Sequence, residues 1–180
     1  QELAPGATVG GAYVYSDLSF ITLMYVVGTV ALDRGLVTAS DFLQPNCGVT
    51  DGLGNAGMRK QCAFEAFVRL HVFQALRMKD TGYLPPRAKW PRCAPTWVPD
   101  GEPGLHGHAL QGRVEDGNCF NMGGVAGHAG VFSTVDDLAK LMRAWMKFDS
   151  DGDKAILSPA AVDLFVRQNN HSKSSRALGW

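Results

Sequence analysis

The stretch GGVAGHAGVFSTVDDLAKLMRAWM, residues 123–146, joins a glycine-rich loop directly to a strongly helical pattern. Thr134 followed by Asp137 is typical of a helix start, and Asp136 and Asp137 stand where the helix dipole favours carboxylates. Apolar side chains then recur every three or four positions, at Leu138, Leu141, Met142, Trp145 and Met146. The pattern predicts a capped helix over residues 135–148 that buries one apolar stripe.

The glycines before this helix raise the question of a phosphate loop, a metal loop or the wall of another active site. A P-loop needs Lys and then Ser or Thr after its last glycine, but Gly130 is followed by Val131 and Phe132. A dinucleotide-binding loop needs a glycine spacing different from the three-residue repeat of Gly124, Gly127 and Gly130. We therefore set nucleotide binding aside and expect the glycines to permit a sharp turn or a close approach of the backbone.

Composition narrows the classes of protein that this chain can represent. Its 180 residues, 46% of them hydrophobic, suffice for one domain or a large piece of one. A net charge of zero without a block of Lys and Arg argues against nucleic-acid binding. The longest uncharged run, residues 18–32, is shorter than the roughly 18 apolar residues of a membrane span. The four cysteines lack the spacing of a zinc site, and we expect free thiols rather than a zinc site or a disulfide framework.

Three more helices are expected from apolar spacing and capping residues. One begins near Asp17 and buries the face formed by Phe20, Leu23, Met24, Val27, Val30 and Ala31. A second covers about residues 62–77, with His71 as a hydrogen-bonded core histidine rather than a ligand. The third follows Ser158 as N-cap and Pro159 as first helical residue.

Loops are expected between these helices. Residues 41–61 are predicted to form an exposed loop, and the proline-rich residues 82–107 a long ordered surface loop of the kind that often carries function. The acidic residues 149–154 are predicted to form a solvated turn, because their spacing does not fit a calcium-binding loop.

Tyr15, Ser16 and Asp17 stand at the threshold of the first predicted helix. Ser16 or Asp17 could simply cap that helix. The alternative is that these three polar side chains belong to a catalytic site. Local sequence leaves both interpretations open.

Four segments, taken in order, carry a resemblance to a known family. They are YSDLSF (15–20), HVFQALRMKDTGY (71–83), GGVAGHAGVFSTVDDLAKL (123–141) and ILSPAAVDLF (156–165). Their order and spacing over nearly the whole chain resemble the serine β-lactamase and penicillin-binding-protein family, in the class C-like branch that also holds DD-peptidases and esterases.

The resemblance implies a serine hydrolase that works through a covalent acyl-enzyme, without a metal or an organic cofactor. The substrate would be a small molecule or peptide with an amide, ester or β-lactam bond. Tyr15 would be the phenol that moves protons, a task that requires nearby cations to stabilise its anion. Asp17 stands where the family usually has Asn, so it keeps an acceptor, loses the amide donors and adds a negative charge. Ser16 is at the variable position between them.

The glycine loop resembles the segment of the family that borders the active-site cleft. The resemblance therefore implies that Gly127, His128 and Gly130 contact the substrate. For His128 the alternative is a hydrogen bond within the loop and no role in the chemistry.

Two motifs that the family requires are absent from this chain. None of the seven lysines has Ser or Thr three residues before it, and no Lys/His-Thr-Gly motif is present. We therefore expect residues 1–180 to be a single piece from the middle of the protein. The expected fold is predominantly α with long loops, the helical lobe of the α/β serine β-lactamase fold without most of its central sheet.

Such a piece is expected to be inactive alone and to pair with the missing flanking segments of its own fold. The alternative function is a non-catalytic binding or structural protein that keeps this lobe. A helical interaction module unrelated to the family is a third interpretation, which the four ordered segments disfavour.

Overall fold

The computed structural model describes residues 14–44, 47, 56–97, 109–146, 157–167 and 177–178. This part of the chain is mostly helical and contains only two small two-stranded sheets, as the sequence predicts. The α-helices are α1 (Asp17–Asp33), α2 (Ala56–Val68), α3 (Gly117–Asn121), α4 (Val135–Trp145) and α5 (Pro159–Val166). Shorter helical segments are η1 (Ala39–Asp41), η3 (Arg69–Gln74) and η4 (Arg87–Arg92).

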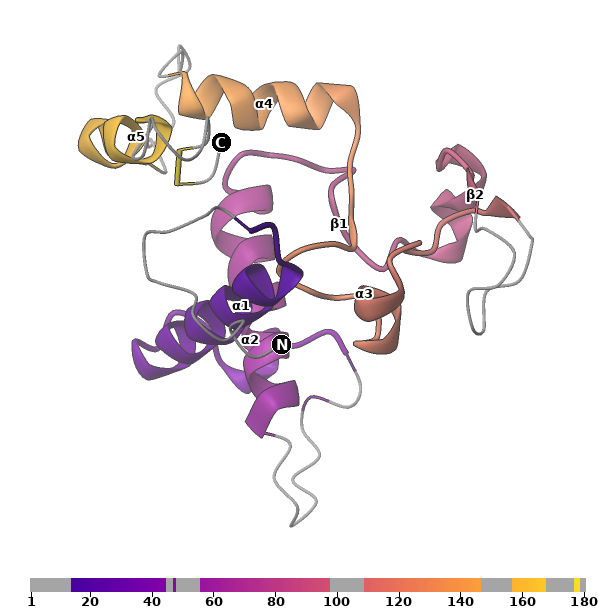
Figure 1. Ribbon diagram of the computed structural model, residues 1–180, viewed down its shortest axis with the longest axis horizontal. Coiled ribbons are helices and arrows are strands. Elements are labelled where there is room, and N and C mark those ends of the chain that lie inside the picture. Colours follow the sequence, from indigo (N-terminus) through magenta and orange to yellow (C-terminus); the bar gives the residue numbers. More distant parts are fainter. Residues whose placement is uncertain are drawn as a thin grey trace.

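Helices α1 and α2 cross closely and form the centre of the fold (Figure 1). A buried apolar cluster joins them, composed of Ala31, Val37, Ala63 and Ala66 with partly buried neighbours around it. At Gly28, a β-carbon would collide with the main-chain carbonyl of Lys60. Small residues therefore let the two backbones approach.

Helix α1 begins as predicted, but its buried face is narrower than the predicted one. Met24 and Ala31 are buried, whereas Phe20, Leu23 and Val30 are 45%, 52% and 49% exposed. The buried line runs through Met24, Gly28 and Ala31, at steps of four and three residues. The helix period was therefore predicted correctly, while the extent of burial was not.

Helix α2 corrects the prediction that residues 41–61 form an exposed loop, because it already begins at Ala56. Gln61 is buried and donates hydrogen bonds from Nε2 to the carbonyls of Met122 (2.7 Å) and Val125 (2.5 Å). The helix continues as the π-helical segment η3. The expected hydrogen bond of His71 is present, between Nε2 and the Leu36 carbonyl at 3.0 Å, but the residue is exposed and the prediction of a core histidine was wrong.

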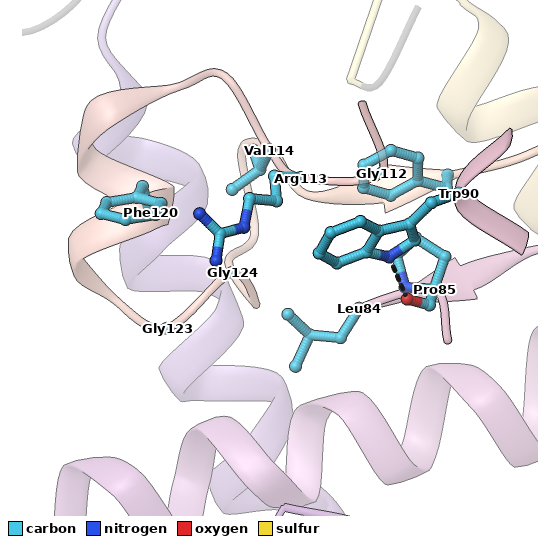
Figure 2. A pocket seen from close by; sticks show the side chains of 10 residues that line it. Leu84, Pro85, Trp90, Gly112, Arg113, Val114, Phe120, Gly123 and Gly124 are labelled. Carbon is cyan, nitrogen blue, oxygen red and sulfur yellow. Dashed lines mark hydrogen bonds between the residues drawn. The ribbon is translucent and has the colours of Figure 1, made fainter. Parts of the chain in front are cut away.

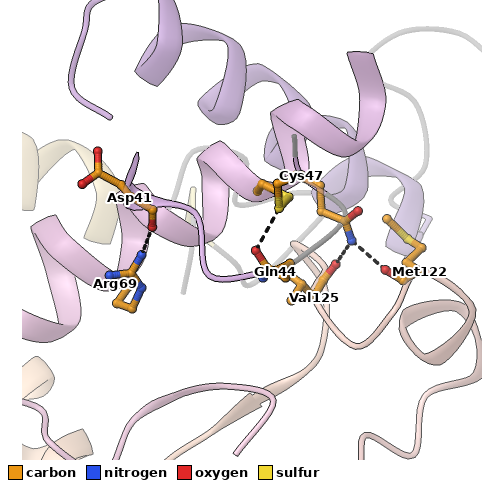
Figure 3. The surroundings of a disulfide bond; sticks show 8 residues. Asp41, Gln44, Cys47, Arg69, Met122 and Val125 are labelled. Atoms are coloured by element: carbon orange, nitrogen blue, oxygen red, sulfur yellow. Dashed lines mark hydrogen bonds between the residues drawn. A yellow bond between two sulfur atoms is a disulfide. The ribbon is translucent and has the colours of Figure 1, made fainter. Parts of the chain in front are cut away.

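A disulfide between Cys47 and Cys62 corrects the prediction of free thiols for these two residues (Figure 3). Their Cα atoms are 6.0 Å apart, which is within the usual range for a disulfide. A spacing of 15 residues does not by itself predict a disulfide. The two cysteines meet because the segment that carries Cys47 packs against α2. Cys93 and Cys119 are free thiols, as expected.

Two short antiparallel pairs organise the loops. Strand β1 (Gly82–Tyr83) pairs with β4 (Val131–Phe132), Gly82 lying opposite Phe132. Strand β2 (Thr96–Trp97) pairs with β3 (Ala109–Leu110), Thr96 lying opposite Leu110. The described part of the predicted loop at 82–107 thus consists of β1, η4 and β2, and residues 98–107 lie outside the described residues.

Helix α4 follows β4 and is capped as predicted, because Thr134 Oγ1 accepts from the Asp137 N–H at 3.3 Å. Its apolar stripe is not buried as predicted: Leu138 is 47% and Met146 61% exposed. The buried side chain of α4 is Asp137, which accepts from Asp80 N, Thr81 Oγ1 and Lys140 Nζ at 2.7–2.9 Å. Polar contacts at its first turn therefore attach α4 to the turn before β1.

Helix α5 also begins as predicted, with Ser158 Oγ accepting from the Ala161 N–H at 3.1 Å and Pro159 in the first turn. The rings of Trp145 and Phe165 lie 6.1 Å apart and join α4 to α5. The turn predicted at 149–154 lies outside the described residues. No helix in the described ranges is both long and apolar enough to cross a membrane.

Candidate active site

A hollow of about 340 Å³ lies at the N-terminus of α1, lined by Tyr15, Ser16, Asp17, Leu18 and Asn118. The first four residues come from α1 and the stretch before it, and Asn118 comes from α3. Ser16 is at the N-cap position of α1, but its side chain makes no capping hydrogen bond to that helix. Ser16 thus occupies the N-cap position that the sequence allows, without a capping bond from its side chain.

Asp116 and His128 form a hydrogen-bonded pair that links α3 to the glycine loop. Asp116 is the N-cap of α3, and its Oδ1 accepts from the Cys119 N–H at 2.7 Å and from His128 Nε2 at 2.9 Å. Because a carboxylate only accepts, this contact assigns the proton to Nε2. Burial alone would raise the pKa of Asp116, but the bonds from Cys119 and His128 outweigh it and lower the pKa below its ordinary value.

Asp17, Asp116 and His128 lie close enough to act as a cluster. One ligand atom from each of them lies within 4.8 Å of the other two. Carboxylate and imidazole groups are ligands for divalent metals, but a metal-bound histidine is usually held by a hydrogen bond at its other nitrogen. His128 Nε2 donates to Asp116, and its buried Nδ1 has no partner among the described residues. In this structure the cluster is a hydrogen-bonded carboxylate–imidazole pair with the Asp17 carboxylate beside it.

The glycine loop, which carries His128, lies against α1. A β-carbon on Gly127 would collide with the Phe20 carbonyl, and one on Gly130 would meet the Gly124 carbonyl and Cys119 Sγ. Gly130 also has φ 103°, which disfavours any side chain. The expectation that the glycines permit close approach is confirmed. Neither Gly127 nor Gly130 lines the hollow, and their contact with substrate stays a prediction.

The groups beneath the loop stay uncharged at neutral pH. Tyr83 donates from its hydroxyl to the Ala126 carbonyl at 3.0 Å, and burial raises the pKa of this phenol. Burial also raises the pKa of the Cys119 thiol to about 11. The loop thus rests on two groups that are neutral at this pH, and Asp17 is the charged residue among those that line the hollow.

Sequence reasoning brought together Tyr15, Ser16 and Asp17 but missed Asp116 and Asn118. The signal for Asp116 was available, because an aspartate before Gly-Asn-Cys is a good N-cap. Helix α3 has only five residues, too few for a visible apolar period. No described residue that lines the hollow is cationic, so the cation expected near the Tyr15 phenol is not among them.

Comparison with known proteins matches residues 46–179 to the family described as Beta-lactamase. A putative D-alanyl-D-alanine carboxypeptidase of Escherichia coli (strain K12) is 34% identical over 79 residues, which are 43% of this chain. An N-acetylmuramyl-L-alanine amidase of Bacillus subtilis (strain 168) is 35% identical over 79 residues, also 43% of this chain. A putative D-alanyl-D-alanine carboxypeptidase of Salmonella schwarzengrund (strain CVM19633) is 24% identical over 184 residues, 95% of this chain.

The chain spans only part of these relatives: 18% of the length of the first two and 35% of the third. The family match contains His128 and the glycine loop, whereas Tyr15, Ser16 and Asp17 precede it.

Proposed function

Because this chain belongs to the beta-lactamase family, we propose that the full-length protein is a serine hydrolase that works through a covalent acyl-enzyme. The names of the relatives favour a peptide-like substrate with an amide bond over an ester or a β-lactam. We further propose that the nucleophilic serine lies outside these 180 residues, since no lysine here has Ser or Thr three residues before it. The 180-residue chain alone is then inactive.

The observation that carries this proposal is the hollow in which Tyr15, Ser16 and Asp17 meet Asn118. Asn118 comes from a part of the sequence distant from the other three, and the Asp116–His128 pair lies beside Asp17. In a serine hydrolase, such a polar hollow would hold the reacting carbonyl and the leaving group between proton donors and acceptors.

Three side chains in the hollow, those of Tyr15, Asp17 and Asn118, have a proposed role. The serine oxygen attacks the carbonyl carbon, the bond to the leaving group breaks, and Tyr15 passes the serine proton to that group. Water then hydrolyses the ester with Tyr15 acting in reverse. Asp17 accepts a hydrogen bond from the substrate amide but cannot donate one. Asn118 lines the same hollow and carries the amide donors that Asp17 lacks.

His128 acts in this scheme as a positioning residue rather than as a group that touches substrate. Its side chain is 3% exposed and its Nε2 donates to Asp116, the N-cap of α3. The pair thereby holds the short helix that carries Asn118.

The test uses the full-length protein, a fluorescent penicillin as acylation probe and a peptide ending in D-alanyl-D-alanine as substrate. Tyr15→Phe is expected to lower kcat by about 10² to 10⁴, the usual contribution of a general acid–base group. Tyr25→Phe, in the middle of α1 and outside the hollow, is the matched control and should leave kcat unchanged. Equal turnover by the two variants would refute the role of Tyr15.

A second test asks whether Asn118 supplies the amide donor that Asp17 lacks. Asn118→Ala is expected to lower kcat/KM about tenfold, since one hydrogen bond to the substrate is lost, and adding Asp17→Asn should restore most of it. Asn121→Ala, at the exposed end of the same helix, serves as control. If Asp17→Asn does not restore kcat/KM in the Asn118→Ala background, the two residues do not share a role in binding the substrate amide.

A second candidate function is a non-catalytic binding or structural protein that keeps this lobe. The observation in its favour is Asp17, which adds a negative charge where the family usually has a neutral amide. Absence of serine acylation in the full-length protein would favour it.

In either case we propose that flanking segments of the same fold cover the exposed apolar residues of α1 and α4. Phe20, Leu23 and Leu138 are 45%, 52% and 47% exposed and require such a cover. Chemical labelling that finds these three side chains accessible in the full-length protein would contradict this.

A further inference from the structure

A second pocket, with a volume of about 280 Å³, lies beside α3 and is lined in part by Phe120 of that helix (Figure 2). Helix α3 contributes to both sites, since Asn118 lines the hollow and Phe120 the pocket. The wall is mainly apolar and aromatic, with Leu84, Pro85, Trp90, Val114, Phe120 and Phe132. Such a lining is typical of a small-molecule site.

The shape of this pocket depends on backbone conformations that few residues adopt. Gly112 has φ 72° and Gly124 φ 84°, and a β-carbon on either would run into the Trp90 indole or the Leu84 side chain. Leu84 itself has φ 48°, a left-handed conformation that is costly for a branched side chain. Trp90 is held by the hydrogen bond from its Nε1 to the Pro85 carbonyl at 2.9 Å. Strained positions of this kind cluster at ligand sites.

Two cations flank the indole that forms one side of the pocket. The guanidinium carbons of Arg87 and Arg113 lie 5.4 and 5.7 Å from the Trp90 ring centroid. Figure 2 shows the Arg113 guanidinium between Phe120 and Trp90. The neighbouring Lys89 and Arg92 both pair with Asp80, whereas no described carboxylate pairs with Arg87 or Arg113.

We propose that this pocket binds a small ligand that carries a carboxylate beside a compact apolar group. The carboxylate would pair with Arg113, for which a planar bidentate contact is available, and the apolar group would replace water on the aromatic wall. A monoanion fits better than a phosphate dianion, because an apolar wall makes each added charge more costly to desolvate. The binding requires no serine chemistry, so it can be measured whether or not the full-length protein is a hydrolase.

The test measures binding of N-acetyl-leucine to the full-length protein by calorimetry and by tryptophan fluorescence. N-acetyl-leucinamide, which has the same apolar group without the carboxylate, is the matched probe. Saturable binding of the acid, about fivefold tighter than the amide, is expected. Trp90→Phe should abolish the change in fluorescence. Equal affinity for acid and amide, or no saturable binding of either, would overturn the proposal.

Variants of Arg113 test whether its guanidinium binds the carboxylate of the ligand. Arg113→Gln should weaken binding of the acid about fivefold and leave the amide unaffected, and Arg113→Lys should retain part of the difference. The exposed Arg59, on α2 and outside the pocket, provides the control Arg59→Gln with the same change of charge. Equal loss in Arg113→Gln and Arg59→Gln would show that the effect is one of net charge and would refute the site.

The carboxylate could come from the substrate or from a separate small molecule, and a kinetic measurement distinguishes the two. Competitive inhibition of turnover by N-acetyl-leucine indicates a part of the substrate, and non-competitive inhibition or activation indicates a separate ligand. Both results support the pocket as a site. If the full-length protein has no hydrolase activity, the binding measurements still decide the proposal.

Discussion

The α1–α2 pair and helix α4 are attached to the molecule by different kinds of contact. Between α1 and α2, small residues such as Gly28, Ala31 and Ala63 bring two backbones together, and a disulfide ties α2 to the preceding segment. Helix α4 is attached by the buried carboxylate of Asp137, while its apolar stripe is only partly buried, with Leu138 and Met146 exposed. Helices α1 and α4 both show a clear apolar period in the sequence. The period therefore predicts that a helix forms but does not say what holds it.

This difference has consequences for stability. Close apolar packing depends on shape and responds strongly to one added methyl group. A buried carboxylate depends on its charge and therefore on pH.

The largest effect is expected from Gly28→Ala in the full-length protein. The added methyl group would meet the Lys60 carbonyl and force α1 and α2 apart, so we expect a loss of about 3 kcal/mol in the free energy of unfolding. Urea denaturation measures it. Gly57→Ala is the matched control, because its β-carbon would lie 3.7 Å from Tyr25 Cε1, an ordinary contact. Gly57→Ala should be neutral or stabilise by up to about 1 kcal/mol, and similar losses in both variants would refute the close crossing.

Removal of the disulfide is expected to have an effect of nearly the same size. Cys47→Ser should cost about 3 kcal/mol, since the bond closes a loop of 15 residues in the unfolded chain. Urea denaturation with and without dithiothreitol measures it, and reductant should bring the wild type to the level of the variant. Cys93→Ser, at a free thiol, should change little. A wild type insensitive to reductant would contradict the bond.

Asp137→Asn is expected to loosen α4 by about 2 kcal/mol, since hydrogen bonds to a charged group are lost. Amide hydrogen exchange should show the loss in α4 and not in α1. Asp136→Asn, at the exposed neighbouring position, removes the same charge from the first turn and controls for the helix dipole. Equal effects of the two variants would assign the result to the dipole.

The same carboxylate predicts a pH dependence. Burial alone would raise the pKa of Asp137, but hydrogen bonds from Lys140, the Asp80 N–H and Thr81 lower it below its ordinary value of 3.8. A lowered pKa means that its stabilising effect is complete above about pH 4 and is lost as pH falls through the folded-state pKa. Protection of α4 amides should follow this course in the wild type and be flat in Asp137→Asn.

The smallest effect is expected at the helix cap. Thr134→Ala should cost about 1 kcal/mol, because the Asp137 N–H loses its acceptor. Thermal denaturation and exchange of the α4 amides measure it. Thr22→Ala, an exposed threonine of α1 that bonds back to the Leu18 carbonyl, should be nearly neutral. An equal loss at Thr22 would show that the cap contributes nothing.

Helix starts were the most predictable part of this fold. Thr134, Ser158 and the α1 start near Asp17 were all placed correctly, because capping depends on residues within one turn. The start of α2 was missed by six residues. Its first turns have few apolar residues, and Gln61 is buried only because the glycine loop lies over it.

The residues of the candidate site also fall into those that the sequence predicts and those that only tertiary packing brings in. Tyr15, Ser16 and Asp17 are adjacent in the sequence and were recognised as a group. Asn118 and Asp116 reach them only through the packing of the glycine loop on α1 at Gly127. No local pattern encodes that contact.

The sequence by itself determined which segments become helices, where most of them begin and the family to which the chain belongs. These properties depend on neighbours three or four residues apart, or on ordered motifs. The tertiary structure alone decided that Cys47 bonds to Cys62, that Asp137 anchors α4 and that Asp116 pairs with His128. Each of these contacts depends on the distance between side chains in space, which is set by how the helices and loops pack together.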